Sequence, residues 1–275
     1  MGLDPDPLHL PPGIEERVRE RGLPEAAAVR EFCLGVLEAV ESEAAAVKLQ
    51  SAYFERLGPE GMEVYATLIQ AASDLGLPTI ADVKRGDIGP VAAAYAEAHL
   101  SAYGATSVTV NPYMGADAVG PFLEEARRLG RGGGAFVLVA TSNPSATQLQ
   151  GSSAPPLYEA AAGLVADLGE TGSSGYLDAG AVVGATRPEV GRRVRELLPN
   201  ALFLAPGYGA QKGGASGVRA LLDAGGAGVL VNSSRGILRA FESLDPASSG
   251  SDYRSAARDA AQRMREDLTT TGVRP

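Results

Sequence analysis

Residues 79–89 read TIADVKRGDIG, an apolar run that passes directly into charged residues and glycines. Apolar runs without polar alternation are typical of parallel strands that helices cover on both faces. In closed α/β barrels, the catalytic groups stand at the carboxyl ends of such strands. The stretch therefore predicts a buried parallel strand that delivers Asp82, Lys84 and Asp87 to a catalytic rim.

The same pattern recurs along the chain. Apolar strand patterns fall at 44–49, 79–83, 106–110, 134–140, 179–183, 201–205 and 228–231. Helical patterns fall at 25–40, 59–75, 90–103, 116–129, 155–168, 188–197 and 216–223, with a last helix at about 252–268. Together with a strand remnant at 1–4, they make eight βα units. An open doubly wound sheet is the alternative, but regular units without a topological switch point favour a closed barrel.

We therefore predict an α/β protein whose residues 1–275 form a single (β/α)8 TIM barrel. No linker or shift in composition divides the chain. The first strand is expected to be truncated, because only Met1, Gly2 and Leu3 precede Asp4. A truncated strand would leave unpaired backbone groups on its neighbours, so this is the weak point of the predicted barrel.

Composition narrows the function classes. The formal net charge of −9 argues against a general nucleic-acid surface, because such surfaces are strongly basic. No apolar run approaches the roughly 18 residues of a membrane span, and we expect no membrane partner. No signal-peptide pattern opens the sequence, and Cys33 is the single cysteine, which fits a reducing compartment. We therefore expect a cytoplasmic protein.

The lysines are rare and therefore informative. Among 24 basic residues only Lys48, Lys84 and Lys212 are lysines, and all three follow predicted strands on the same rim. Lysine offers a compact charge that can take part in proton transfer, whereas arginine stays protonated. The pattern indicates that the retained lysines serve chemistry.

Lys84 stands between two carboxylates. Asp82 and Lys84 are two residues apart on the predicted strand, so their side chains share a face, and Asp87 follows a Gly-bearing turn. Both carboxylates favour a protonated lysine. Such an array can stabilise a developing anion and then protonate it. A structural salt bridge that closes the barrel end is the alternative, but the polar run is long for a simple brace.

The loops after the seventh and eighth strands predict an anion site. Barrels often bind phosphate there, and Gly207 and Gly209, with Gly213 and Gly214, allow backbone N–H groups to approach an anion. Arg235 could chelate two phosphate oxygens. Neither His9, His99 nor any cluster of acidic residues has metal-ligand spacing, so we expect no metal.

Residues 82–89 resemble the signature of the orotidine 5'-phosphate decarboxylases, and in particular the bacterial branch whose motif reads D-x-K-R-G-D-I-G. Further stretches fall in family order: Leu3-Asp4-Pro5, Val47-Lys48-Leu49-Gln50, Ala140-Thr141-Ser142-Asn143-Pro144, Val182-Val183-Gly184-Ala185-Thr186, Pro206-Gly207-Tyr208-Gly209-Ala210-Gln211 and Ser234-Arg235-Gly236. The resemblance runs from Asp4 to about the last helix. It implies decarboxylation of orotidine 5'-phosphate to UMP in pyrimidine biosynthesis, without a cofactor.

The resemblance also implies roles for individual residues. The charged array around the reacting carbon would consist of Lys48, Asp82, Lys84 and Asp87. Lys84 would stabilise and protonate the carbanion, and Asp82 would crowd the substrate carboxylate. Asp87 and Ile88 would act in the neighbouring subunit's site, so a homodimer is expected.

The remaining implied roles concern substrate binding. Asp4 and Lys48 would hold ribose hydroxyls, Ser142 and Gln211 the pyrimidine edge, and Gln211 and Arg235 the phosphate; Pro206, Gly207 and Gly209 would complete the phosphate loop. Family members commonly carry Thr where this chain has Val91, so one hydrogen bond of roughly 0.5–1.5 kcal/mol is expected to be missing. Weaker substrate binding should follow.

Two other readings stay open at this point. A sugar-phosphate enzyme of the same superfamily would share the barrel, the D-x-K-x-x-D run and the phosphate loops. Such enzymes usually need magnesium and lack pyrimidine-reading residues, so Ser142 and Gln211 favour the nucleotide. The second reading is a catalytically dead nucleotide-binding barrel, which would bind UMP without turnover.

Overall fold

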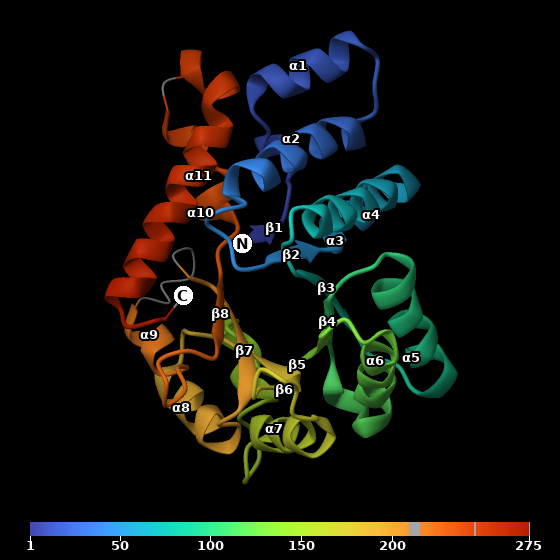
Figure 1. Cartoon of the computed structure of the whole chain (residues 1–275), viewed down its shortest axis with the longest axis vertical. Helices are drawn as coiled ribbons and strands as arrows, with labels where there is room; N and C mark the ends of the chain where they lie inside the picture. Colours follow the sequence, from blue (N-terminus) through green and yellow to red (C-terminus); the bar gives the residue numbers. More distant parts are fainter. Residues whose placement is uncertain (209–214, 245, 275) are drawn as a thin grey trace. The chain divides into compact units, whose positions relative to one another are not determined.

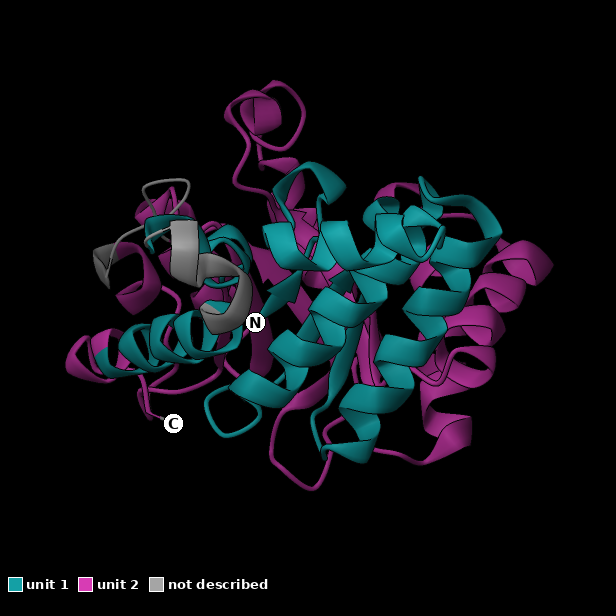
Figure 2. Ribbon diagram, turned by 90° about the horizontal axis from the view of Figure 1, so that it is seen from above, with its two compact units in different colours: residues 1–82, 233–266 teal, residues 83–232, 267–275 magenta. Residues whose placement is uncertain are grey.

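The computed structural model describes residues 1–208, 215–244 and 246–274. The chain forms two compact units, Met1–Asp82 with Ser233–Glu266 and Val83–Asn232 with Asp267–Pro275, which Figure 2 colours separately. The boundary between them passes through one strand, after Asp82. Within the described residues, no helix combines the length and the hydrophobicity needed to cross a membrane.

Eight strands form one sheet in the order of the sequence, β1 to β8. They are β1 Gly2–Leu3, β2 Val47–Gln50, β3 Thr79–Arg85, β4 Ser107–Val110, β5 Gly134–Ala140, β6 Leu177–Val183, β7 Ala201–Pro206 and β8 Val229–Asn232. Strands β1 to β3 pair in parallel, and so do β4 to β8. Sequential order without a switch point is the topology of a (β/α)8 barrel, which confirms the predicted fold class.

Helices connect the strands, as Figure 1 shows. The α-helices are α1 Pro12–Glu20, α2 Glu25–Val40, α3 Ala52–Glu55, α4 Gly58–Asp74, α5 Gly89–Ala96, α6 Ala116–Leu129, α7 Leu157–Leu168, α8 Pro188–Leu197, α9 Ala215–Arg219, α10 Arg235–Leu238 and α11 Pro246–Thr270. Short 3-10 turns are η1 Pro7–His9, η3 Pro112–Met114, η4 Pro144–Gln148 and η5 Ala240–Ser243, and η2 Glu97–Ala102 is a π-helix.

The first unit packs α2 against α4, and the two helices lie side by side in Figure 1. Phe32 of α2 is buried and meets the rings of Phe241 and Tyr253 at centroid distances of 6.2 and 5.5 Å. Gly35 lies one turn later on α2, and a Cβ there would collide with the Tyr253 side chain. A glycine at this position therefore lets α11 approach α2, so that the two ends of the sequence share one core.

Strand β1 is as short as expected, with two residues, yet its backbone is paired. Gly2 and Leu3 are in register with Lys48 and Leu49 of β2. The Gly2 N–H donates to the carbonyl of Ser233, the residue that follows β8, at 2.8 Å. The unpaired backbone groups expected next to a truncated strand are therefore satisfied at Gly2 on both sides.

The second unit carries a buried arginine at the amino ends of β7 and β8. Arg195 of α8 donates to the carbonyl oxygens of Leu198, Ala201, Leu221 and Gly228 at 2.8–3.0 Å. Its guanidinium lies 3.6 Å from the centre of the Phe203 ring. Burial lowers the pKa of Arg195 to about 10. The side chain therefore stabilises the amino-terminal ends of β7 and β8, away from the carboxyl-terminal rim where the catalytic groups are predicted.

Candidate active site

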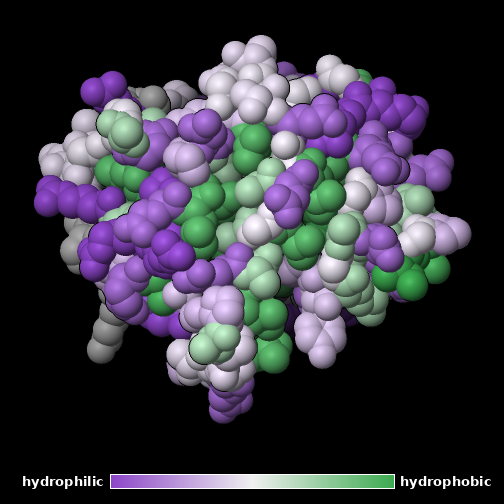
Figure 3. Space-filling view, turned by 90° about the horizontal axis from the view of Figure 1, so that it is seen from below, coloured by the Kyte–Doolittle hydropathy of each residue, from purple (hydrophilic) through white to green (hydrophobic). Residues whose placement is uncertain are grey.

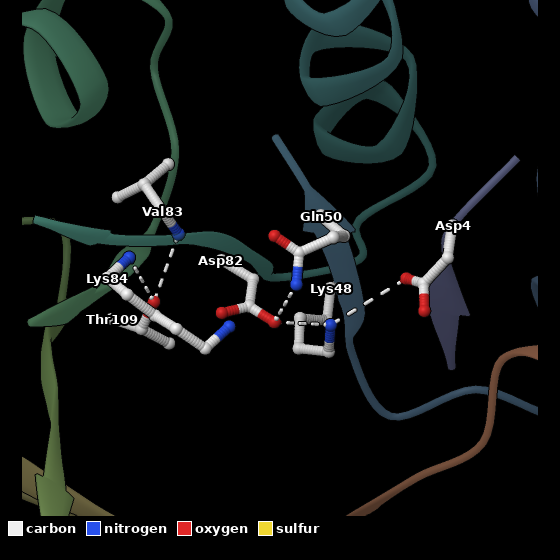
Figure 4. Close-up of polar contacts among 7 residues, drawn as sticks. All are labelled: Asp4, Lys48, Gln50, Asp82, Val83, Lys84 and Thr109. Carbon is white, nitrogen blue, oxygen red and sulfur yellow. Dashed lines mark hydrogen bonds and ion pairs between the residues drawn. The ribbon is translucent and has the colours of Figure 1, made fainter. Parts of the chain in front are cut away.

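A buried ion pair joins β2 and β3. The Lys48 ammonium donates to Asp82 Oδ2 at 2.6 Å, and only 5% and 6% of the two residues are exposed. Gln50 lies two residues beyond Lys48 on the same face of β2 and is in register with Asp82. Its Nε2 donates to the same carboxylate oxygen at 3.0 Å (Figure 4). Two donors thus hold the Asp82 carboxylate in one orientation.

Asp4 extends this pair to a row of alternating charges. It directly follows β1, and its Oδ1 lies 3.8 Å from the Lys48 ammonium. This Oδ1 is buried and accepts no hydrogen bond from the described residues. A buried carboxylate oxygen without a donor is costly, so it is a natural acceptor for a ligand hydroxyl. The first unit therefore presents Asp4, Lys48 and Asp82 in sequence, as Figure 4 shows.

Lys84 has an unusual backbone conformation. Its φ of 46° lies in the left-handed region, and among the described residues no other non-glycine residue has a positive φ. Such a conformation costs about 1–3 kcal/mol and persists only where the surrounding structure holds it. Regular strand geometry is therefore interrupted at Lys84, one residue before the end of β3. The Lys84 residue is exposed.

The backbone around Lys84 is held by the neighbouring strand. The N–H groups of Val83 and Lys84 donate to Thr109 Oγ1 of β4 at 3.0 and 2.9 Å. On the other side of Lys84, the Arg85 carbonyl accepts from the Asn111 N–H at 2.8 Å. Lys84 is therefore fixed by hydrogen bonds immediately before and after it.

The loop that carries Asp87 is also ordered by local contacts. Asp87 Oδ1 accepts from the Ile88 N–H at 2.8 Å, just before α5 begins. The Arg85 guanidinium lies 5.3 Å from the ring centre of Tyr95 in α5 and donates to the Val83 carbonyl at 3.3 Å. Asp87 is half-buried, whereas Ile88 is 50% exposed.

Ser142 stands in a braced loop after β5. Its carbonyl accepts from Thr186 at 3.4 Å, and a Cβ on Gly184 would lie 2.8 Å from the Ser142 Cα. Gly184 therefore permits the close approach of these two loops. Gln150 closes a double hydrogen bond with the backbone N–H and the hydroxyl of Thr141, at 2.9 and 2.8 Å.

The predicted phosphate loops are described in part. Pro206 ends β7, and Gly207 has a φ of 97° that only glycine adopts readily. Arg235 is the first residue of α10 and is exposed. Gly209, Gln211 and Lys212 lie outside the described residues, so their predicted roles have no geometry here.

Two residues of this constellation were missed by sequence reasoning. Gln50 had a signal, because it stands two positions after Lys48 on one strand and must share its face. No signal in the sequence pointed to Thr109, because its contact with the Lys84 N–H depends on how β3 lies against β4 and on the irregular backbone around Lys84.

The sequence pattern of the family described as "Orotidine 5'-phosphate decarboxylase / HUMPS family" matches residues 2–249. A relative named "Orotidine 5'-phosphate decarboxylase" from Rhodopirellula baltica is 42% identical over 282 residues, covering 98% of this chain and 93% of the relative. One with the same name from Deinococcus radiodurans is 41% identical over 260 residues, covering 93% and 90%.

Solved structures agree with this similarity over the whole chain. A putative orotidine-monophosphate-decarboxylase from Toxoplasma gondii is 32% identical with a TM-score of 0.80, covering 98% of this chain and 90% of that one. A putative orotidine 5'-phosphate decarboxylase from Streptomyces avermitilis is 30% identical with a TM-score of 0.77, covering 100% and 98%.

Proposed function

The chain belongs to the orotidine 5'-phosphate decarboxylase / HUMPS family, and on that basis we propose that it converts orotidine 5'-phosphate to UMP and carbon dioxide, with Lys84 as the proton donor. The observation that carries the assignment is the row of Asp4, Lys48 and Asp82, of which Lys48 and Asp82 are buried, followed by Lys84 two residues later on β3. Family similarity covers all four positions.

The proposed reaction breaks one carbon–carbon bond and forms one carbon–hydrogen bond. Carbon dioxide leaves the pyrimidine ring, and the bonding electron pair stays on the ring carbon as a carbanion. The Lys84 ammonium stabilises this charge and transfers a proton to the carbon, giving UMP; the neutral amine then regains a proton from solvent. Asp82, held by Lys48 and Gln50, would lie beside the substrate carboxylate and disfavour the ground state.

The ribose is proposed to bind at Asp4 and Lys48. Support comes from Asp4 Oδ1, which is buried and accepts no hydrogen bond from the described residues. A ribose hydroxyl would supply the missing donor. Lys48, already paired with Asp82 at 2.6 Å, would donate a second hydrogen bond to the sugar.

We propose that the loops after β5 and β7, together with the first residue of α10, recognise the base and the phosphate. Ser142 and Gln211 would read the pyrimidine edge, while Gln211, Arg235 and the loop from Pro206 through Gly207 and Gly209 would hold the phosphate. Binding energy from the phosphate, remote from the reacting carbon, can drive desolvation of the charged array.

We also propose a homodimer in which Asp87 and Ile88 reach the neighbouring subunit's site. Hydrophobic and hydrophilic residues alternate over the face of the molecule in Figure 3, as on most protein surfaces. Several large apolar residues of the second unit are exposed: Ile88, Val91 and Tyr95, which follow Asp87 in the chain, and Tyr113 and Met114, which follow the residue that packs against Gly86, Asn111. An apolar group of this kind is typical of a surface that another chain covers.

Three finer assignments complete the proposal. The residues 82–89 support membership of the bacterial D-x-K-R-G-D-I-G branch. The family match over 2–249 supports one catalytic domain, residues 1–275. The single cysteine, Cys33, supports a cytoplasmic location.

The direct test is the loss of ultraviolet absorbance when orotidine 5'-phosphate is added to the protein in the presence of EDTA. Rapid loss supports the decarboxylase. A folded protein that is inactive on this substrate but converts a sugar phosphate with magnesium would be the superfamily relative. Tight UMP binding without turnover would indicate the dead barrel.

A further inference from the structure

Thr109 is a buried residue of β4 whose hydroxyl serves the backbone of the neighbouring strand. It is 1% exposed and is in register with Phe136 of β5. Its Oγ1 accepts hydrogen bonds from two consecutive backbone N–H groups, those of Val83 at 3.0 Å and Lys84 at 2.9 Å. Figure 4 shows both bonds converging on the one oxygen.

This arrangement is incompatible with a regular strand. Successive N–H groups of a strand point to opposite sides, so they do not meet at one acceptor. The backbone torsions of Val83 set the orientation of its N–H relative to the N–H of Lys84, so the chain leaves the regular strand geometry at Val83. The next residue, Lys84, has a left-handed φ of 46°. The double hydrogen bond therefore orients the peptide groups that lead into the left-handed residue.

Further contacts fix the chain beyond Lys84. The Asn111 N–H donates to the Arg85 carbonyl at 2.8 Å, and Asn111 Oδ1 accepts from the Tyr113 N–H at 3.0 Å. Asn111 packs against Gly86, where an added Cβ would lie 3.1 Å from the Asn111 Cβ. These contacts constrain residues after Lys84, whereas Thr109 contacts the backbone N–H groups of Val83 and Lys84 themselves.

We propose that Thr109 is a positioning residue for the decarboxylation: its hydroxyl orients the peptide group that precedes Lys84 and so sets the direction from which the ammonium reaches the reacting carbon. The inference rests on the proposed function and assigns the residue no contact with substrate. A misplacement of about 1 Å in a catalytic group can reduce the rate of the chemical step about 100-fold while leaving substrate binding intact.

The test compares Thr109→Val, Thr109→Ser and Thr79→Val. Valine keeps the shape of threonine but removes the acceptor, so kcat should fall roughly 10- to 100-fold while the Kd for UMP stays close to that of the unaltered protein. Serine keeps the hydroxyl and should restore kcat. Thr79 is a buried threonine at the first position of β3, at the other end of this strand from Lys84. Thr79→Val therefore controls for the loss of a buried hydroxyl.

Several outcomes would overturn the inference. One is a Thr109→Val variant with unchanged kcat; another is a parallel loss of kcat and UMP binding that Thr79→Val reproduces. If Thr109→Val fails to fold, Thr109→Ser and Thr109→Cys decide, because sulfur is a weak acceptor of similar placement; equal kcat for these two contradicts the proposal. An unaltered protein without decarboxylase activity would instead refute the proposed function.

Discussion

At the scale of single residues, the site is built around Lys48, which is ion-paired with Asp4 and Asp82. Buried charges are tolerated when they are paired and hydrogen-bonded, and Lys48 meets Asp82 at 2.6 Å under these conditions. The lysines and aspartates could be predicted from the sequence, because their residue types stand out at strand ends. The role of Gln50 could not, since a neutral amide gains its meaning only from the carboxylate that it contacts.

Gln50 gives a prediction at this scale. Gln50→Glu should reduce kcat roughly 10-fold near pH 8, because a hydrogen bond to a charged group is replaced by repulsion between two carboxylates. At lower pH the pair takes up a proton and regains a donor, so the activity relative to the unaltered protein should recover. The check is the ratio of kcat values from pH 5 to 8.

Gln50→Met is the matched control for this experiment, because it has similar length but no donor or charge. It should be impaired at every pH without recovery. A Gln50→Glu variant whose relative activity does not depend on pH would show that Asp82 does not need this contact.

At the scale of elements, the sequence predicted the long periodic segments well. The predicted strand 134–140 and helices 25–40, 116–129 and 188–197 have the bounds of β5, α2, α6 and α8. Helical turns of three or four residues, such as α3, α10 and η1, were missed, because so few residues show no helical period and their conformation depends on loop packing. Helix α1 was missed as well.

One predicted helix divides for a physical reason. The pattern at 90–103 corresponds to α5 followed by the π-helix η2. Within η2 the Ser101 hydroxyl donates to Glu125 of α6, and Arg128 donates to both oxygens of the same carboxylate at 2.7 Å. The π-helical turn thus coincides with a side-chain contact between η2 and α6. The hydrophobic period of one helix does not predict such a contact with another helix.

This contact predicts how stability depends on pH. The hydrogen bonds from Arg128 and then Ser101 lower the pKa of Glu125 from 4.5 to about 2. A carboxyl whose pKa is lower in the folded state stabilises the fold above its unfolded pKa, and loses that effect as pH falls through the folded value. Glu125→Gln should therefore lower the Tm by roughly 1–3 °C at pH 7.

The difference in Tm should shrink as pH falls from about 4.5 toward 2. Glu124→Gln, at the exposed neighbouring position, makes the same change in charge and should have little effect at any of these pH values. Thermal unfolding of the three proteins at pH 7, 4 and 3 measures this. A Glu125→Gln difference that grows on acidification would contradict the assignment.

At the scale of the whole molecule, topology explains why distant residues can serve one reaction. Parallel strands in sequential order bring their carboxyl ends to one rim. The sequence pattern alone therefore predicts that Lys48 and Asp82 lie close together, as they do. The left-handed conformation of Lys84 lay beyond sequence reasoning, because local propensity disfavours it and the hydrogen bond between the Lys84 N–H and Thr109 of β4 is a tertiary contact.

The proposed dimer gives a prediction at this scale. Each site would combine Lys84 of one subunit with Asp87 of the other, so Lys84→Ala and Asp87→Ala should each be inactive alone. Random pairing after mixing makes about half of the dimers mixed, each with one intact site, so about a quarter of full activity should return.

A mixture of Lys84→Ala with the double variant Lys84→Ala/Asp87→Ala is the control and should stay inactive. Sedimentation of each variant confirms that pairing persists. If the first mixture shows only the sum of the separate activities while mixed dimers form, Asp87 acts within its own subunit.

The central claim is that Lys84 protonates the carbon from which carbon dioxide departs. Its most direct test is the absorbance decay with orotidine 5'-phosphate for the unaltered protein and for Lys84→Ala, beside UMP binding to both. The account predicts that Lys84→Ala binds UMP but loses at least about 1,000-fold in kcat, since both charge stabilisation and proton transfer are removed. A folded Lys84→Ala variant that decarboxylates within about 10-fold of the unaltered protein would contradict it.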